Sequence, residues 1–335
     1  MPQNKRIWYG LDLFKFCAAV LIVFLHTYNS DWGFTGLWIK EVLSRAGVPF
    51  FFLTSGFLLR YGIDKALEQG GEEGEKRWFG KYMSRLIKIY AAWSIITLPI
   101  AFLIVNRGHP NYGILMKIAY HFRLFFFTGS VGFLWYILAL IISAVIIHWF
   151  YRKKRTGLLV FISILLFLWG CAYDSPLNKQ QPYFEILHIV FGSTRNFLNV
   201  GLFYMLAGFL FPMPQVSTVS GIKRYLPVVL LLASILIRSF ELTFLKTGFT
   251  TMLVAFSVFL VALSFDYRCI APLSLELRKL SIGLYLLHVP FILSFDFYLT
   301  RGTIIDFPLS LIFSFVTYYL LTRLAPKISS LLFGY

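Results

Sequence analysis

The chain has 335 residues, of which 58% are hydrophobic and only 14% are charged, whereas soluble domains are about a quarter charged. Its formal net charge is +16, but basic residues on so hydrophobic a chain more often set membrane topology than bind nucleic acid. The composition therefore excludes an ordinary soluble protein and favours a membrane protein. The three cysteines, Cys17, Cys171 and Cys269, have no spacing typical of a zinc site or a disulfide framework.

Long apolar runs predict an all-α, polytopic transmembrane helical bundle, because barrel strands alternate with a period of two and lack runs of about 20 apolar residues. We expect a single transmembrane domain over 1–335, an uncleaved first span and no separate soluble domain. The apolar stretch at 113–128 carries Lys117, His121 and Arg123, which favours an interfacial or re-entrant helix. The ten expected spans are about 8–29, 42–61, 82–105, 132–150, 156–173, 196–212, 225–241, 247–264, 280–299 and 304–324.

The distribution of basic residues predicts the orientation of these spans. Ten spans place both termini on the same side of the membrane. Lys and Arg on that side outnumber those on the other side roughly two to one, and cytoplasmic loops are the ones enriched in basic residues. Both termini are therefore predicted to lie in the cytoplasm.

The first span is unusual because it carries three ionisable residues, Asp12, Lys15 and His26. Lys15 and His26 are eleven residues apart, so they share a helix face at an axial separation of about 16 Å and do not touch. Asp12 precedes Lys15 by three residues and can pair with it. Charged residues within a membrane usually face a partner or a cavity, yet a lone histidine can also be structural. We expect Lys15 near the cytoplasmic end and His26 buried toward the outer face.

A charged segment separates the second and third spans. The loop at 61–81 contains EQGGEEGEKR and is predicted to be flexible. Lys81, Arg85 and Lys88 follow at helical spacing, at the cytoplasmic mouth of the third span. They are either a positive-inside anchor or a clamp for an anionic ligand such as a phosphate.

Polar residues also mark other spans. Ser55 lies in a small polar notch at 54–56 of span two, which indicates either close helix packing or a polar lining for a substrate path. Trp135 opens span four as an interfacial aromatic residue, and Arg195 lies at the outer rim before span six. In span nine, His288 is expected to be buried about two turns from the cytoplasmic end, with Tyr285 three residues before it. Tyr285 and His288 are either structural hydrogen-bonding residues or part of a site.

Five short motifs together resemble the acyltransferase 3 family, ten-helix bacterial membrane proteins that O-acylate surface glycans and other envelope molecules. In chain order they are Lys15 and His26 with ten residues between them, VPFFFLTSGFLL at 48–59, KYMSRLIKIY at 81–90, LWYI around Trp135 and LSIGLYLLHVP at 280–290. The resemblance extends from Gly10 to the tenth span. The chain departs from the family pattern at Lys15, where many members have arginine, and at Ala91, where a proline often follows the tyrosine.

The resemblance implies a multi-pass acyltransferase of the bacterial cell membrane. It would move an acyl group, with acetyl expected, from acetyl-CoA or another acyl-CoA to a hydroxyl of an envelope polysaccharide or a similar acceptor. His26 would be the general base, and Asp12 belongs to the predicted catalytic set because it would hold Lys15. The predicted donor-binding residues are Lys15, Arg85 and Lys88, and the predicted acceptor-binding residues are Ser55, Trp135, Arg195, Tyr285 and His288. No metal is expected, and the expected partners are the lipid bilayer, the acceptor, and a second copy or polysaccharide-synthesis proteins.

Two other functions stay open on the sequence. One is a transporter of an amino acid or a lipid-linked sugar, in which His26 and His288 line a pathway. The TRN stretch at 194–196 supports this alternative, because it resembles members grouped with membrane serine-uptake proteins of glycopeptide resistance. The other is a non-catalytic member of a polysaccharide synthesis or export complex, which would tolerate substitution of His26.

Overall fold

The computed structural model describes residues 8–174, 193–212, 225–244, 249–265, 267–298 and 303–334. Every regular element within these ranges is helical, which confirms the predicted all-α class. The chain divides into two compact units: unit 1 is Met1–Phe51 with Pro212–Leu324, and unit 2 is Phe52–Phe211 with Ala325–Tyr335. The single transmembrane domain stays a prediction.

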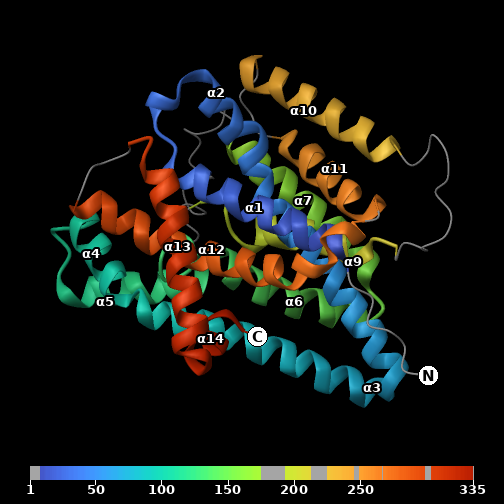
Figure 1. Ribbon diagram of the computed structural model, residues 1–335. Coiled ribbons are helices and arrows are strands. Elements are labelled where there is room, and N and C mark those ends of the chain that lie inside the picture. Colours follow the sequence, from blue (N-terminus) through green and yellow to red (C-terminus); the bar gives the residue numbers. More distant parts are fainter. Residues whose placement is uncertain are drawn as a thin grey trace. The chain divides into compact units, whose positions relative to one another are not determined.

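Unit 1 is formed by the beginning of the chain and by most of its last third (Figure 1). Helix α1 packs along α12 and also contacts α11 and α13, while α10 packs on α11. Its elements are α1 (Tyr9–Thr27), η1 (Ser30–Trp32), α2 (Gly33–Trp38), the π-turn η2 (Ile39–Leu43), η3 (Ser44–Ala46), α10 (Leu226–Phe244), α11 (Thr251–Ser264), η8 (Arg268–Ile270), α12 (Ala271–Tyr298) and α13 (Asp306–Leu324).

Unit 2 contains the middle of the chain and its last helix. Helix α6 packs against α9 and against η6, the short π-helix before α9. Helix α7 packs on the same two elements. The elements are α4 (Leu98–Gly108), α5 (Ile114–Arg123), the π-turn η4 (Leu124–Thr128), α6 (Trp135–Arg152), α7 (Thr156–Asp174), the π-turn η6 (Phe197–Gly201), α9 (Leu202–Leu210) and α14 (Pro326–Phe333). Helix α3 (Gly47–Ile96) begins in unit 1 and continues into unit 2.

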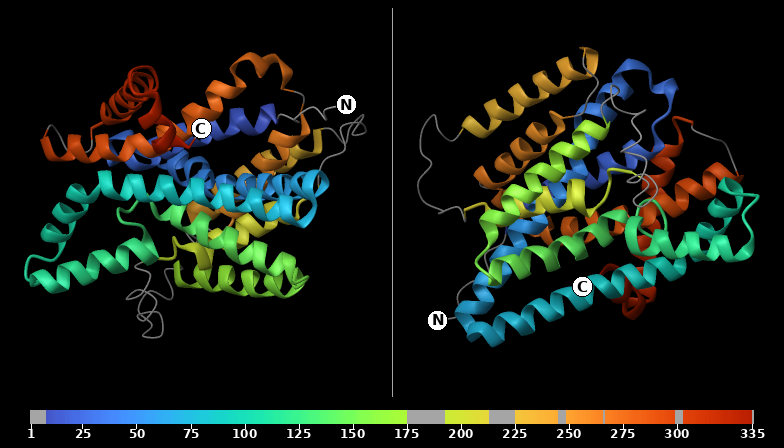
Figure 2. Two further views of the ribbon diagram at one scale, coloured as in Figure 1. Left: turned by 90° about the horizontal axis from the view of Figure 1, so that it is seen from below. Right: turned by 180° about the vertical axis from the view of Figure 1, so that it is seen from behind.

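Helix α3 is broken at Gly70 and Gly71, where Gly71 has φ of 57° and ψ of −154°, a conformation that glycine adopts readily. Figure 2 shows the two limbs, blue and cyan, on either side of this break. The prediction of a flexible loop at 61–81 is wrong, because the residues around the break are helical. Glu, Gln, Lys and Arg favour helix, and their propensity outweighs the polar character of the segment. The limbs also approach closely, since a Cβ atom on Gly74 would lie 2.8 Å from the Ala66 carbonyl oxygen.

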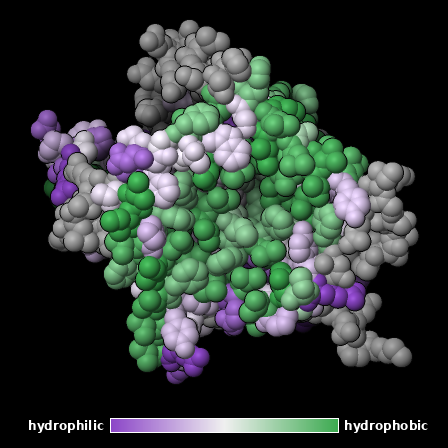
Figure 3. All heavy atoms as spheres, turned by 45° about the horizontal axis from the view of Figure 1, so that its top comes forward, coloured by the Kyte–Doolittle hydropathy of each residue, from purple (hydrophilic) through white to green (hydrophobic). Residues whose placement is uncertain are grey.

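The helices have the length and hydropathy of membrane spans. In the described part of the chain, five helices are long and apolar enough to cross a bilayer, or six if Thr251–Ser264 and Arg268–Leu293 form one bent span. Hydrophobic residues cover most of the coloured part of the face seen in Figure 3, as expected for helices that contact lipid. Each predicted span overlaps a helix, and 113–128 is also helical. These features are consistent with a multi-pass membrane protein, whereas ten crossings and cytoplasmic termini stay predictions.

Part of the topology prediction cannot be followed in the fold. The Lys and Arg residues that contributed to it but lie outside the described residues are Lys5, Arg6, Lys179, Lys223, Arg224, Lys246 and Arg301.

Helices α3 and α9 cross with their backbones in close contact. A Cβ atom on Gly56 would lie 1.9 Å from the Met205 carbonyl oxygen, and one on Gly208 would lie 1.9 Å from the Leu53 carbonyl oxygen. Neither position accepts a side chain unless one helix moves. Small residues at such crossings are how membrane helices approach each other. The notch at 54–56 therefore supports close helix packing, which was one of its two interpretations.

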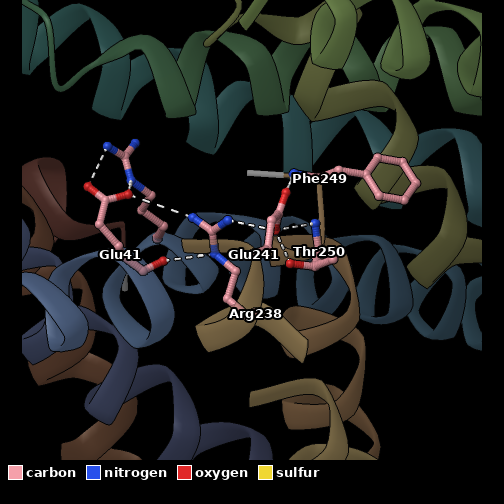
Figure 4. A network of polar contacts seen from close by, with 6 residues as sticks. Glu41, Arg238, Glu241, Phe249 and Thr250 are labelled. Carbon is pink, nitrogen blue, oxygen red and sulfur yellow. Dashed lines mark hydrogen bonds and ion pairs between the residues drawn. The ribbon is translucent and has the colours of Figure 1, made fainter. Parts of the chain in front are cut away.

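A buried ionic network connects η2, α10 and α11 in unit 1 (Figure 4). Arg238 Nη1 donates to Glu241 Oε2 at 2.7 Å, and Arg238 Nε donates to the Glu41 carbonyl oxygen at 3.2 Å. Glu241 also accepts hydrogen bonds from the backbone N–H groups of Phe249 and Thr250, at 2.9 and 3.1 Å. These N–H groups lie just before α11. The Glu241 carboxylate on α10 therefore accepts hydrogen bonds from backbone N–H groups at the beginning of α11.

Candidate functional site

A charged cluster lies at the beginning of α1 and α12, and it consists of Asp12, Lys15, Ser274 and Arg278. Asp12 is only 2% exposed. Its carboxylate accepts hydrogen bonds from Arg278 Nε at 2.9 Å, from Arg278 Nη2 at 2.7 Å and from the Ser274 hydroxyl at 2.6 Å. Lys15 Nζ lies 3.3 Å from the same carboxylate. Two cations therefore share one buried carboxylate, which meets the requirement that buried charges be paired and hydrogen-bonded.

The pairing of Asp12 with Lys15 is confirmed, but Arg278 and Ser274 are not revealed by sequence reasoning. The ninth span was predicted to begin at residue 280, which places Arg278 in a loop as a topology charge. Helix α12 instead begins at Ala271, because the polar segment before residue 280 continues the helix. Ser274 and Arg278 are four residues apart and so share a helix face, and this spacing was the available signal.

The other end of α1 carries an imidazole pair, His26 and His288. The two ring centroids are 5.3 Å apart and the ring planes are tilted by 40°. His288 is 0% exposed, which confirms its predicted burial, and its Nδ1 lies 2.9 Å from the Leu284 carbonyl oxygen. The Tyr285 ring lies 6.1 Å from the His288 ring, as their spacing predicts, and packs near Phe51.

The position of His26 differs from the prediction. His26 lies in the last turn of α1 and its side chain is exposed, so the expectation of a buried His26 is wrong. The helix ends at Thr27, one residue after His26, and the chain is extended at Tyr28. An exposed imidazole in front of a buried one is accessible to a ligand.

Helices α1 and α12 run parallel, because Asp12 contacts Arg278 and His26 contacts His288. The eleven residues from Lys15 to His26 span about 16 Å, and the ten residues from Arg278 to His288 span about 15 Å. Both helices therefore set nearly the same distance between the charged cluster and the imidazole pair. The cluster has one more positive than negative charge. Arg278 is also 38% exposed, and its guanidinium has N–H groups beyond the two that bind Asp12.

Unit 2 contains a second group of predicted site residues. The Ser55 hydroxyl lies 3.1 Å from the Tyr136 hydroxyl. Phe52 lies beside both Trp135 and Tyr136, with ring centroids 5.9 and 4.6 Å away. Ser55 and Trp135 are thus brought together around Phe52 and Tyr136.

The remaining predicted residues of unit 2 are exposed. Arg85 and Lys88 lie on α3, three residues apart, and Arg85 packs on the Tyr82 ring at 5.9 Å. Arg195 is exposed before η6, while its neighbour Asn196 is buried and accepts hydrogen bonds from the backbone N–H groups of Leu198 and Asn199. Exposure leaves Arg85 and Lys88 accessible to an anionic ligand.

A comparison with protein-family models identifies the family of the chain. The model described as "Acyltransferase domain", that of acyltransferase 3, matches residues 8–323. The chain belongs to the acyltransferase 3 family. This match includes most of both units and all the predicted site residues, and it confirms the resemblance drawn from the five motifs. Membership of the acyltransferase 3 family suggests acyltransferase activity.

Among characterised proteins, this acyltransferase 3 member is similar to racemases. It is 24% identical over 335 residues to an amino-acid racemase of Enterococcus faecalis, which covers 95% of the chain but 46% of the relative. A serine/alanine racemase of Enterococcus gallinarum is 25% identical over 208 residues, which cover 58% of the chain and 27% of the relative. The chain spans less than half the length of either relative. No solved structure matches it significantly.

The geometry gives this acyltransferase 3 member two chemical capabilities. The charged cluster holds fixed cations that suit a phosphate or another anion, because guanidinium and ammonium groups bind such oxygens strongly. The imidazole pair presents an accessible nitrogen base, and histidine is the side chain most often used for proton transfer in catalysis.

Proposed function

We propose that the chain is an acyltransferase of the bacterial cell membrane that moves an acyl group, with acetyl expected, from an acyl-CoA to a hydroxyl of a cell-envelope acceptor such as a surface polysaccharide. The observation that carries this proposal is the parallel pair of α1 and α12. It bears cations at one end and an accessible histidine about 16 Å away at the other, in a member of an acyltransferase family.

The charged cluster is the proposed anchor of the donor. Lys15 and Arg278 bind phosphate oxygens of coenzyme A, and Asp12 is a positioning residue that holds both cations. The extended pantetheine arm follows the α1–α12 pair, so that its thioester reaches His26. Arg85 and Lys88 are proposed as further donor contacts, on the support of their exposure and of the basic series that they share.

His26 is the proposed general base. It takes the proton of an acceptor hydroxyl while that oxygen attacks the thioester carbonyl carbon; the C–S bond then breaks, and coenzyme A leaves as a thiol. A base placed in this way contributes typically about 10²- to 10⁴-fold to the rate. Ser55, Trp135, Arg195 and Tyr285 stay proposed acceptor contacts.

The test is transfer of a radiolabelled acetyl group from acetyl-CoA to envelope polysaccharide by the purified protein in lipid nanodiscs. The wild type should transfer label, and His26→Ala should lose transfer while it inserts normally. His109→Ala is the matched control, since His109 lies after α4 and outside the proposed site. Retained transfer in His26→Ala would remove His26 from the catalytic role.

The donor contacts are tested by binding of coenzyme A. Arg85→Glu should weaken binding, because the reversed charge repels the phosphates. Arg155→Glu, an exposed cation in the basic turn before α7, controls for the change in net charge. Equal binding by both variants would reduce the Arg85 series to topology signals.

A second candidate function is the transport of an amino acid; the relatives, named as racemases of amino acids such as serine and alanine, support only the class of ligand. In that case His26 and His288 line the path of the substrate. Uptake of labelled serine by proteoliposomes, without acetyl transfer in the nanodisc assay, would favour transport over acyl transfer.

A further inference from the structure

His288 is held in one tautomer. Its Nδ1 lies 2.9 Å from the Leu284 carbonyl oxygen, one turn earlier in α12. A carbonyl oxygen can only accept a hydrogen bond, so the ring proton is on Nδ1 and the lone pair of a neutral ring is on Nε2. The ring is 0% exposed, and the cost of burying a charge favours the neutral form. His288 therefore offers a hydrogen-bond acceptor at a fixed place.

His26 is close enough to use that acceptor. The two ring centroids are 5.3 Å apart and the ring planes are tilted by 40°. A change in the side-chain torsions of the exposed His26 brings one of its ring nitrogens to about 3 Å from His288 Nε2, the length of an N–H···N hydrogen bond. His26 is exposed, whereas His288 is buried beside it. One ring nitrogen of His26 can thus donate to His288 Nε2 while the other stays accessible.

We propose that His288 is a positioning residue for His26: its Nε2 accepts the N–H of His26 and leaves the lone pair on the outer nitrogen of that ring. The catalytic effect of this hydrogen bond rests on the proposed acyl transfer. In this role His288 acts through His26 and does not make the direct acceptor contact that the sequence predicts. The hydroxyl proton moves to the outer nitrogen as the ester C–O bond forms. The thioester C–S bond breaks, and the leaving thiolate takes that proton.

The contribution of His288 follows from the chemistry of neutral imidazole. Only one of the two ring nitrogens of His26 has a lone pair, and the base is competent only when that nitrogen faces the acceptor. Without His288 the ring of His26 divides between two tautomers and two orientations. The rate of proton transfer then falls, while the charged cluster that anchors the donor is unchanged.

The first test is nuclear magnetic resonance of the full chain in micelles, labelled with ¹⁵N only in histidine. We expect a protonated Nδ1 and an unprotonated Nε2 for His288, a single tautomer for His26, and a coupling across the hydrogen bond between the two rings. His26→Asn identifies the signals. In His288→Phe, His26 should become a mixture of tautomers, and it should stay single in the control Leu287→Met, a buried neighbour on α12.

A protonated Nε2 on His288, or a His26 tautomer unchanged by His288→Phe, overturns the proposal. The wild-type spectrum decides on its own if His288→Phe does not fold, since a His26 that is a mixture of tautomers in the wild type also overturns it. These readouts need no activity. They test the hydrogen bond between His26 and His288 even if the wild type transfers no acetyl group. Absence of acetyl transfer would refute the proposed function and not the hydrogen bond.

The second test separates kcat from KM in the acetyl-transfer assay. His288→Phe should lower kcat about 10- to 100-fold. This is the range typical of removing the hydrogen-bond partner that orients a metal-binding histidine, and we expect a similar effect on a histidine base. The KM for acetyl-CoA should not change. His288→Gln should recover part of the loss, because its amide oxygen is again an acceptor. A loss confined to KM, or equal losses in the Phe and Gln variants, contradicts positioning by hydrogen bond.

Discussion

Replacement of Arg278 by glutamine should destabilise the fold strongly, because it leaves a carboxylate buried with too few partners. Asp12 is 2% exposed and receives two of its hydrogen bonds from Arg278. Hydrogen bonds to charged groups contribute about 1.5–3 kcal/mol each, so the two together correspond to about 3–6 kcal/mol. Lys15 and Ser274 stay in contact with Asp12, which places the expected loss near the lower limit, at about 3 kcal/mol.

The assay is reversible unfolding in mixed detergent micelles, followed by circular dichroism. Glu276→Gln is the matched control, since it breaks an exposed pair with Lys279 at 3.5 Å on the same helix. Exposed pairs of this kind contribute about 0–1 kcal/mol. The free energy of unfolding should therefore fall far less in Glu276→Gln than in Arg278→Gln.

A double-mutant cycle shows whether the buried carboxylate is the cause. In an Asp12→Asn background, Arg278→Gln should cost less than about 1 kcal/mol, because no buried charge is left unpaired. An equal cost in both backgrounds, or a cost no larger than that of Glu276→Gln, would refute the reasoning.

Two further predictions concern packing and the network of α10 and α11. Gly56→Val should reduce the free energy of unfolding by more than about 3 kcal/mol, the upper range for an overpacked core, because even a Cβ atom there meets α9 backbone. Gly80→Ala, where no atom lies within 4 Å of the added carbon, should be neutral or stabilising in the same unfolding assay; similar losses in both variants would contradict the close crossing. Glu241→Ala should cost about 3 kcal/mol, near the lower limit for breaking a buried ion pair, since Arg238 loses its 2.7 Å contact and keeps only the longer ones with Glu41, and since the N–H groups before α11 lose their acceptor. Faster hydrogen exchange at the first turn of α11 checks this effect, and unchanged exchange would rule out the capping role.

Several features of the site follow from the sequence because they depend on local helix geometry. Asp12 pairs with Lys15 three residues later, and Tyr285 lies beside His288 for the same reason. Each of these pairs requires only that its segment be helical, because residues three apart are neighbours on a helix. The apolar runs predict both helices. The prediction of a flexible loop at 61–81 is wrong because the helix propensity of its Glu, Gln, Lys and Arg residues outweighs their polarity.

What the sequence by itself determined is an all-helical membrane protein with ionisable residues on one face of its first helix. Only the tertiary structure decided which residues meet that face. Arg278 binds a carboxylate 266 positions earlier, and His288 lies against a histidine from the other end of the chain. Such contacts depend on the register at which α1 and α12 pack, which the periodicity of either helix leaves open. The sequence thus supplies the groups of the candidate site, and the parallel packing of two distant helices arranges them.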